Sequence, residues 1–344
     1  MGVLREKSEE AIDFVITWVD GSDEAWRRVK ESHAQRSSQD EKDKNTEARY
    51  RDIGLLKYWF RGVEKFAPWV RTVHFVTCGQ KPDWLNTAHP KLHMVKHSDY
   101  MPPECLPTFN SNAIELGMHR IPGLSECFVY FNDDVFLTAP VSRNFFFRRG
   151  LPRDMYEIYA LVCKDDPDNI NAIQINDLGI INKHFAGRKS KLRSFSKKIS
   201  PTYSIGANLR NLYNMALSGY LGFIDHHLAA AYRKQDFETI WELEETRLSK
   251  VSMNKFRTPY DLNHWIFRYR HLVTGEFEPI NMKKHGRYFE LHVFNQEPVE
   301  AIQSQTYKMI CLNDRMEPDQ VEKWTAALHA AFEAILPEKS AFEL

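Results

Sequence analysis

The stretch Phe128-Val-Tyr-Phe-Asn-Asp-Asp-Val-Phe-Leu137 decides the fold. It reads as an apolar, aromatic strand that is interrupted by Asn132, Asp133 and Asp134. Burying two adjacent carboxylates is costly unless a cation, an arginine or a proton compensates them. A strand that ends in paired carboxylates is suited to hold magnesium or manganese against a phosphate. The simpler interpretation is a strand end with two solvated aspartates.

Two other apolar runs end in polar or glycine residues. Residues 13–20 break into an acidic turn that continues through Gly21 to Asp23, and residues 72–78 run into Gly79. In open α/β sheets, ligands bind outside the carboxyl ends of the strands. The sequence therefore places a ligand site where these three strands end.

A helix is predicted between the first two strands, because Leu55, Trp59, Val63 and Phe66 recur at helical spacing before Pro68. Strand, helix, strand and a third strand together predict an α/β fold with a Rossmann-like central sheet. The sheet is expected to end after Asp134. Residues 1–145 are thus expected to form the Rossmann-like half. Residues 146–344 are mixed and mainly helical, especially over 207–272, and complete the active site within one integrated catalytic domain.

Composition excludes several classes of protein. The chain has 46 Lys and Arg residues and 46 Asp and Glu residues. It therefore has no net charge whose electrostatic field would attract nucleic acid or an anionic membrane. Five dispersed cysteines without a CxxC pair indicate reduced thiols in a cytoplasmic protein. The charged N-terminus lacks the apolar core of a secretory signal. The basic segment 187–200 is expected to be a flexible surface loop, or else a contact for an anionic acceptor or a membrane.

Two local patterns have a plain structural interpretation. A final amphipathic helix is predicted from Pro318 to the residue before Pro337. Asn313 and Asp314 precede it and either cap it or contact a metal or the donor. A short helix over residues 112–120 carries Glu115, for which a surface ion pair with Arg120 is the simplest interpretation.

Four sequence blocks carry a resemblance to a known family. They are Ile16-Thr-Trp-Val-Asp-Gly-Ser-Asp23, a long block from Arg49 to Val135, residues 227–261, and Cys311-Leu-Asn-Asp314 with the closing residues 336–342. In this order they resemble the Stealth family of sugar-phosphate transferases. That family includes bacterial capsular polysaccharide phosphotransferases and the catalytic subunit of lysosomal-enzyme N-acetylglucosamine-1-phosphotransferase.

The resemblance implies a glycosyltransferase-A-like sheet and the transfer of a hexose-1-phosphate from a nucleotide-sugar, expected to be a UDP-sugar, to an acceptor hydroxyl. A phosphodiester forms and a nucleoside monophosphate leaves, in capsular or cell-surface polysaccharide synthesis. The chain departs from the family pattern at residues 53–55, at Ala229 and at Arg315. These departures do not change the predicted class of reaction, but they leave the identities of the donor and the acceptor undetermined.

Four functional positions of the family have matching residues in this chain, namely Glu115, Asp134, His227 and Arg257. The resemblance implies that Asp134, with Asp133, binds Mg²⁺ or Mn²⁺ across the phosphates. Arg257 clamps a phosphate oxygen, and His227 is the general base, a role that Glu115 shares or supports by orienting the histidine. His226, beside His227, leaves the choice of base open.

The remaining expected site residues fall into two sets. Asn313 and Asp314 join the expected metal site. The nucleotide pocket is expected to include Trp18, Asp20, Gly21, Arg49, Thr77, Gly79, Gln80, Asn110 and Asn112, although Trp18 also fits a plain core position.

Two other functions fit parts of this pattern. A metal-dependent glycosyltransferase would use the same acids and donor but attack the anomeric carbon. A non-catalytic sugar- or nucleotide-binding module would not need Glu115, Asp134, His227 and Arg257 together. The expected partners are a nucleotide-sugar donor and a saccharide acceptor, with no nucleic acid. The expected location is the cytoplasm, and a peripheral place at the inner face of the membrane is left open.

Overall fold

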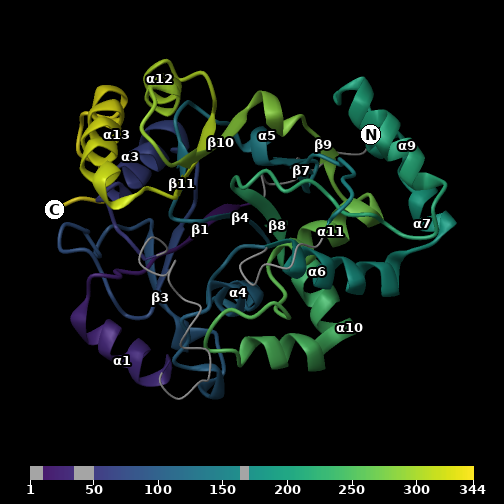
Figure 1. Ribbon diagram of the computed structural model, residues 1–344, viewed down its shortest axis with the longest axis horizontal. Coiled ribbons are helices and arrows are strands. Elements are labelled where there is room, and N and C mark those ends of the chain that lie inside the picture. Colours follow the sequence, from purple (N-terminus) through teal and green to yellow (C-terminus); the bar gives the residue numbers. More distant parts are fainter. Residues whose placement is uncertain (1–10, 35–49, 163–169) are drawn as a thin grey trace, which may run out of the picture.

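The computed structural model describes residues 11–34, 50–162 and 170–344 (Figure 1). Its strands are β1 (Ile12–Thr17), β2 (Val73–Thr77), β3 (Leu92–Lys96), β4 (Cys127–Phe131), β5 (Val135–Leu137), β6 (Phe147–Arg148), β7 (Leu151–Asp154), β8 (Ala230–Arg233), β9 (Glu278–Pro279), β10 (Gly286–Leu291) and β11 (Met309–Asp314). Its α-helices are α1 (Glu24–Ala34), α3 (Leu56–Phe66), α4 (Ser111–Leu116), α5 (Arg143–Phe146), α6 (Ile170–Phe185), α7 (Arg188–Leu192), α8 (Phe195–Lys198), α9 (Ile205–Met215), α10 (Lys234–Ser252), α11 (Trp265–Thr274), α12 (Glu297–Gln303) and α13 (Val321–Ile335).

The central sheet has the strand order β3-β2-β1-β4-β8. The first four strands are parallel, and β8 runs antiparallel to β4. Ile16 of β1 is in register with Phe75 on one side and Phe131 on the other. The chain adds β2 and β3 on one side of β1 and then crosses to β4 on the other side. This order confirms the Rossmann-like prediction, and it places the topological switch point between β1 and β4, where such sheets bind ligands.

The expectation that the sheet ends after Asp134 is wrong. Directly after Asp134 the chain enters β5, which pairs with β11 in a second sheet of order β10-β11-β5. In addition, β8 lies inside the region predicted to be mainly helical, and it joins the central sheet. Both strands are only three or four residues long, so they carry too little periodicity to be predicted locally. The ranges 1–145 and 146–344 thus share both sheets.

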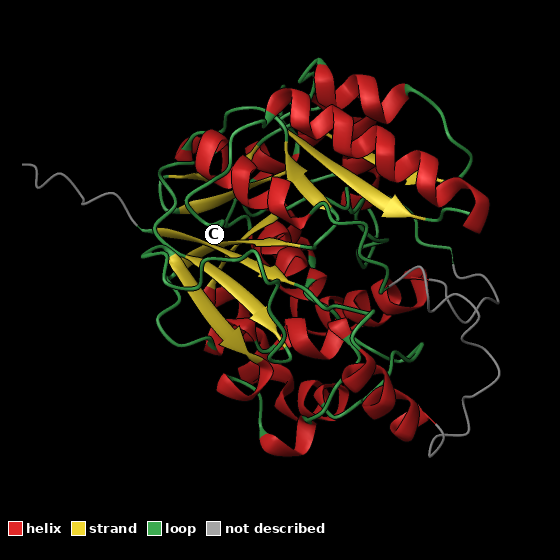
Figure 2. Ribbon diagram, turned by 90° about the vertical axis from the view of Figure 1, so that its left-hand side faces the viewer, coloured by secondary structure: helices red, strands yellow, loops and turns green. Residues whose placement is uncertain are grey.

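Helices lie on both faces of the central sheet (Figure 2), and alternate side chains of its strands point to these opposite faces. On one face, Trp59 and Phe60 of α3 meet Phe131 and Phe75 edge to face, at centroid distances of 5.4 and 5.7 Å. On the other face, Phe128 of β4 packs 5.6 Å from Phe237 of α10, which stacks on Phe267 of α11. The predicted helix between β1 and β2 is confirmed as α3, and its apolar stripe is part of the core.

The segment 187–200 is not a simple solvated loop, because it contains α7 and α8 and two of its lysines are buried. The ammonium of Lys191 donates to the carbonyls of Asn214, Leu217 and Gly219 at 2.6–2.8 Å. These carbonyls lie at and just beyond the end of α9. Lys198 likewise donates to Val273 O, near the end of α11, at 2.8 Å. A cation at a helix C-terminus satisfies carbonyls that the helix itself leaves unpaired.

The final helix is confirmed as α13, which follows a short 3-10 turn at Pro318–Gln320. Asn313 and Asp314 end strand β11, and Gln320 occupies the N-cap position of α13. The interpretation that Asn313 or Asp314 caps this helix is therefore wrong.

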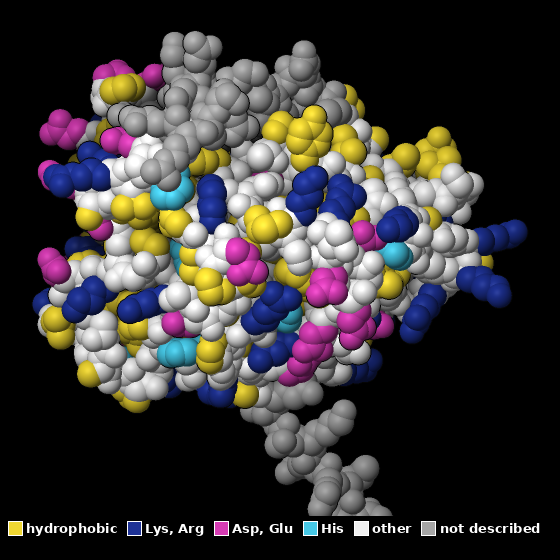
Figure 3. All heavy atoms as spheres, turned by 90° about the horizontal axis from the view of Figure 1, so that it is seen from below, with side chains coloured by type: hydrophobic (Ala, Val, Ile, Leu, Met, Phe, Trp, Pro, Cys, Tyr) yellow, Lys and Arg dark blue, Asp and Glu magenta, His cyan; other side chains and the backbone are white. Residues whose placement is uncertain are grey.

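The surface carries mixed charge. Figure 3 shows acidic and basic side chains interspersed over the face seen from below, in keeping with the zero net charge. Among the described residues, no helix combines the length and the apolar character that a bilayer span requires.

A buried carboxylate fastens the amino ends of the central strands. Asp13 of β1 is fully buried and accepts hydrogen bonds from Arg71, from His74 Nε2 at 3.0 Å and from the Ser125 amide at 2.8 Å. Burial alone would raise the pKa of Asp13, but these hydrogen bonds from His74, Arg71 and Ser125 hold it well below its usual range.

We expect Asp13→Ala to lower the free energy of unfolding by about 3 kcal/mol, because it leaves Arg71 and His74 without their buried anion. Urea denaturation at neutral pH measures the loss, with the exposed Asp83→Ala as the control. The wild-type advantage is full above the unfolded pKa of about 3.9 and shrinks as the pH falls below it, since the folded pKa is depressed. A loss within about 0.5 kcal/mol, as is usual for surface positions, would contradict this role.

Candidate active site

Asp133 and Asp134 form the turn by which the chain leaves one sheet and enters the other. The Val135 amide donates to Asn132 O at 3.1 Å, and Asp134 O accepts from the Leu312 amide of β11 at 2.9 Å. The turn is therefore fixed from both sheets. It lies at the carboxyl end of β4, beside the topological switch point.

The two carboxylates of this turn have few compensating partners. Asp134 Oδ2 accepts from the Cys311 thiol at 3.2 Å, while the buried Asp134 Oδ1 has no hydrogen-bond partner in the described part of the chain. Although the Asp133 side chain is exposed, protein atoms surround it densely, and this desolvation, then repulsion from Asp134 and Asp52, raises the pKa of Asp133 to about 7. Desolvation also raises the pKa of Asp134, opposed by the Cys311 hydrogen bond and the charge of His227.

Glu115 is buried on α4 and does not form the surface ion pair with Arg120. Arg120 instead lies 3.9 Å over the ring of Trp241. Glu115 Oε1 accepts from Tyr130 OH at 3.2 Å, and His264 Nε2 lies 4.0 Å from Glu115 Oε2. Burial raises the pKa of Glu115 to about 7, although the charge of Arg257 opposes the rise.

Arg257 acts electrostatically on both Glu115 and Asp133. Its Nη2 donates to Ser111 Oγ on α4 at 2.5 Å, and its charge lowers the pKa of both Glu115 and Asp133. The side chain is exposed, so its remaining donors face solvent. This geometry presents a planar set of N–H donors beside the acidic turn, as recognition of a phosphate requires.

A buried aspartate, Asp261, fixes the loop that carries Arg257. Its carboxylate accepts from Thr258 Oγ1 and Asn254 Nδ2 at 2.8 Å, and from the Thr258 amide at 3.2 Å. It also accepts from Asn110 Nδ2 at 2.7 Å and Asn112 Nδ2 at 3.1 Å. Asp261 thus ties the loop over residues 254–261 to the start of α4, where Asn110 is also the N-cap.

Asn110 and Asn112 were expected in the nucleotide pocket. Both are buried, and both amides donate to Asp261, so in this structure they support the positions of Arg257 and Glu115. Whether they also contact a nucleotide stays a prediction.

His227 is held by two aromatic side chains. Its ring packs 5.4 Å from Trp265 and 5.0 Å from Tyr288, and its charge acts on Asp134. Tyr288 OH accepts from Asn313 Nδ2 at 2.9 Å, which connects the end of β11 to this histidine. The backbone of His227 has φ of 49°, a left-handed conformation that is uncommon for a residue with a side chain and occurs at functional sites.

The neighbouring His226 has a different environment. Its Nε2 is buried without a hydrogen-bond partner among the described residues, and burial, then the charge of Arg268, lowers the pKa of His226 to about 3. Of the two histidines, only His227 acts on the pKa of Asp134, and its ring packs on Tyr288, the strand neighbour of Cys311. These contacts favour His227 over His226 as the residue that acts at the turn.

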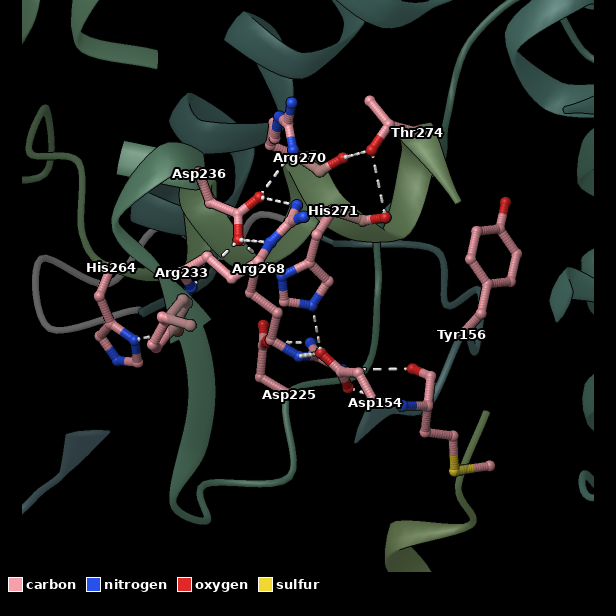
Figure 4. A network of polar contacts seen from close by, with 12 residues as sticks. Asp154, Tyr156, Asp225, Arg233, Asp236, His264, Arg268, Arg270, His271 and Thr274 are labelled. Atoms are coloured by element: carbon pink, nitrogen blue, oxygen red, sulfur yellow. Dashed lines mark hydrogen bonds and ion pairs between the residues drawn. The ribbon is translucent and has the colours of Figure 1, made fainter. Parts of the chain in front are cut away.

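A buried network of charged residues holds the turn before His227 (Figure 4). Arg268 of α11 pairs with Asp225 at 2.6 Å and with Asp154 at 2.8 Å, and it donates to Ile224 O at 3.0 Å. Tyr269 OH donates to the other oxygen of Asp225 at 2.6 Å. Both oxygens of Asp225, two residues before His227, are thus engaged by side chains of α11.

Asp314, expected to join the metal site, has other partners. It lies 3.2 Å from Arg51 Nη1 and accepts from the Met316 amide at 2.9 Å. Within residues 11–34, 50–162 and 170–344, no three His, Cys, Asp or Glu side chains come together as a ready metal site. The acidic turn offers the two carboxylates of Asp133 and Asp134. Asp314 Oδ2 is also buried without a hydrogen-bond partner among the described residues, so the place of Asn313 and Asp314 in the metal site stays a prediction.

The ends of β1 and β2 form one connected loop pair. Gln80 accepts from the Asp20 amide at 2.9 Å and donates to Asp20 O at 3.0 Å. Thr77 Oγ1 donates to Gln80 O and accepts from the Gly79 amide. These contacts place the predicted nucleotide-pocket residues Asp20, Thr77, Gly79 and Gln80 side by side.

Two other predicted pocket residues are held by packing. A Cβ on Gly21 would lie 2.1 Å from Tyr50 O, so only glycine fits there. Trp18 is buried and stacks on Phe75 at 5.6 Å, as its core interpretation expects. Arg49 lies outside the described residues.

Sequence reasoning missed the side chains that link these groups. Tyr130, within the apolar run of β4, joins Glu115 to Thr17 Oγ1, which lies 3.0 Å from the Tyr130 hydroxyl. His264 and Tyr288 were also missed. Asp261 closes the third sequence block, and that position was the only signal that pointed to it.

Family models match this chain in three of the regions that contain the sequence blocks described above. Models of the Stealth protein family match residues 10–32 (conserved region 1), 49–154 (conserved region 2) and 300–344 (conserved region 4). The capsular polysaccharide phosphotransferase WcwK of Streptococcus pneumoniae is 38% identical over 337 residues, which cover 98% of this chain and 99% of that protein.

Two further relatives are similar over nearly their whole lengths. The receptor polysaccharide phosphotransferase WefC of Streptococcus gordonii is 36% identical, covering 97% of this chain and 99% of its own. The exopolysaccharide phosphotransferase cps2G of Lactiplantibacillus plantarum is 36% identical, covering 96% of each chain. A solved apo structure of the bifunctional glycosyltransferase WbbM aligns with 96% of this chain and 51% of its own, at 10% identity and a TM-score of 0.39.

We expect Asp261→Asn to loosen the Arg257 loop, because an amide nitrogen would face donors that now bind a carboxylate. Hydrogen bonds to a charged group contribute about 1.5–3 kcal/mol each, so the free energy of unfolding should fall by at least about 2 kcal/mol. Hydrogen exchange of residues 254–261 should accelerate more than that of β1 and β4. Unchanged exchange in this loop would show that Asp261 does not fix it.

Proposed function

The chain belongs to the Stealth family, and we propose that it transfers a hexose-1-phosphate from a UDP-sugar to an acceptor hydroxyl. It is a transferase of the polysaccharide phosphotransferase type, like the relatives named above. In the proposed reaction, the acceptor oxygen bonds to the β-phosphorus, the bond from that phosphorus to the bridging oxygen breaks, and UMP leaves. The product is a phosphodiester in a capsular or other cell-surface polysaccharide, made on the cytoplasmic side.

One observation carries this proposal. His227 packs on Tyr288, whose strand neighbour Cys311 donates to Asp134, and Arg257 is held by Ser111 of α4 and lowers the pKa of Asp133. Phosphoryl transfer needs charge neutralisation, alignment and a proton acceptor more than covalent help from the protein. Arg257, His227, Asp133 and Asp134 supply that set.

The acidic turn also fits a divalent cation. The orphaned Asp134 Oδ1 and the exposed Asp133 carboxylate are hard oxygen donors, and Mg²⁺ commonly takes one or two carboxylates and completes its shell with substrate phosphates and water. We therefore propose Asp133 and Asp134 as the ligands of Mg²⁺ or Mn²⁺. When bound, such an ion neutralises charge on the diphosphate.

The chain's own residues have separate proposed roles. Arg257 binds a non-bridging phosphate oxygen through the donors that Ser111 leaves free. His227 accepts the proton of the acceptor hydroxyl, and Trp265 and Tyr288 hold its ring in place. Glu115, whose pKa is raised to about 7, keeps Arg257 oriented and is the second candidate for the base.

We expect phosphorus NMR of the reaction with UDP-sugars to show a new phosphodiester signal and the release of UMP. Both signals follow from attack at phosphorus. A metal-dependent glycosyltransferase would attack the anomeric carbon, so it would release UDP and form no phosphodiester. Release of UDP without a phosphodiester signal would overturn the proposed function in favour of that alternative.

We expect Asp134→Asn to reduce turnover by at least about a hundred-fold, because it removes a charged ligand of the cation that would neutralise the phosphates. Without divalent cations the variant should be at least as stable as the wild type, since it removes a like charge beside Asp133. Adding Mg²⁺ should raise the melting temperature of the wild type more than that of the variant.

The exposed Asp83→Asn serves as the matched control for this variant, and it should retain wild-type turnover and the response to Mg²⁺. Near wild-type turnover of Asp134→Asn at limiting Mg²⁺ would show that Asp134 does not bind the ion.

A further inference from the structure

Helix α9 exposes its apolar side. Ile205, Leu209, Leu212 and Tyr213 are 81, 61, 52 and 64% exposed. Their spacing of four, three and one residues places them on one face of the helix. An ordinary surface helix buries such a stripe, so this arrangement is inverted.

The opposite face of α9 is polar and buried. Asn211 is fully buried, donates to Tyr156 O and Lys198 O at 2.9 Å, and accepts from the Ile158 amide at 2.9 Å. Asn214, also fully buried, accepts from the Leu221 amide at 3.0 Å. Specific hydrogen bonds therefore hold the helix with its apolar stripe outward, and the exposure is part of the fold.

The neighbouring helix α7 and the residue after it carry exposed cations. α7, which contacts α9 and lies at the same edge of the molecule in Figure 1, carries Arg188 and Lys189, and Arg193 follows it. All three side chains are exposed, and in the described part of the chain none forms an ion pair. They line an open recess of about 730 Å³.

The acids around α7 and α9 already have cationic partners, so they do not neutralise these residues. The pairs are Glu157 with Arg210 and Lys283, Glu244 with Lys183 and His184, Glu276 with Arg233 and Arg270, and Glu278 with Lys197.

We propose that α9, with α7 beside it, docks the protein on the surface of an anionic lipid bilayer. A bilayer interface accepts apolar side chains without a complementary pocket, and anionic lipids attract nearby Lys and Arg. Leu192 of α7 and Phe195 of α8 are also exposed and extend the apolar area. The docking surface consists of the α9 stripe, these two residues, and Arg188, Lys189 and Arg193. It lies outside the catalytic residues and does not depend on the reaction proposed above.

The test is co-sedimentation of the full chain with vesicles of phosphatidylcholine alone and of phosphatidylcholine mixed with phosphatidylglycerol. We expect binding to the mixed vesicles only, weakened by added salt. The variant Leu209→Gln with Leu212→Gln should bind at least about ten-fold more weakly, since two apolar side chains no longer enter the interface. Removing the three cations as Arg188→Gln, Lys189→Gln and Arg193→Gln should weaken binding by about a hundred-fold, or about five-fold per charge.

The matched control is Leu243→Gln, which replaces an exposed leucine of α10 and should bind like the wild type. Glutamine is a good helix former, so the α9 variant should keep the wild-type circular dichroism and the activity on water-soluble substrates. No binding to the mixed vesicles, or binding that neither variant weakens, would overturn the proposal. Self-association in solution that the α9 variant abolishes, without vesicle binding, would overturn it in favour of a contact between copies of the chain.

Discussion

The arrangement of the site depends on one constraint, that two neighbouring carboxylates share a single turn that protein atoms surround densely. The turn that carries Asp133 and Asp134 is also where the chain passes from the central sheet to the second sheet, so it cannot move away without breaking the pairing of β5 with β11. Positive groups must therefore come to the acids. Arg257 arrives on a loop fixed by Asp261, and His227 arrives on a turn fixed by Asp225 and Arg268. The loop and the turn are thus held by separate sets of hydrogen bonds and ion pairs. Such independent support suits a site that must be organised before the substrate binds.

The parts of the fold that could be predicted are those with strong local periodicity. The strands β1, β2 and β4 and the helices α3 and α13 each carry a run of apolar residues long enough to show its period. The strands β5 and β8 could not be recognised, because their assignment depends on pairing with β11 and β4 rather than on their own few residues. The burial of Lys191 and Lys198 was hidden for a similar reason, since only the folded chain brings helix ends to their ammonium groups.

The site can likewise be divided into features that the sequence predicted and features that it did not. Matched blocks pointed to Glu115, Asp134, His227 and Arg257. In the structure Arg257 lowers the pKa of Glu115 and Asp133, and His227 lowers that of Asp134, while the roles of all four stay predictions. What the sequence left open was the local environment. The choice between His226 and His227 depends on which ring faces the acids, and Asp314 looked like a free acid until its pairing with Arg51 was visible. Such facts arise from contacts between residues up to about 260 positions apart, which no local pattern encodes.

The pairing of β5 with β11 also has a consequence for synthesis of the protein. Residues 135–137 leave the ribosome long before residues 309–314, so a growing chain carries both aspartates while the strand that fixes their turn does not yet exist. Pairings between distant segments form late and slowly, because the intervening loop must be closed first. An unfinished polypeptide therefore holds the acids without the scaffold that aligns them. Any activity that depends on this aligned turn therefore requires that translation has passed β11.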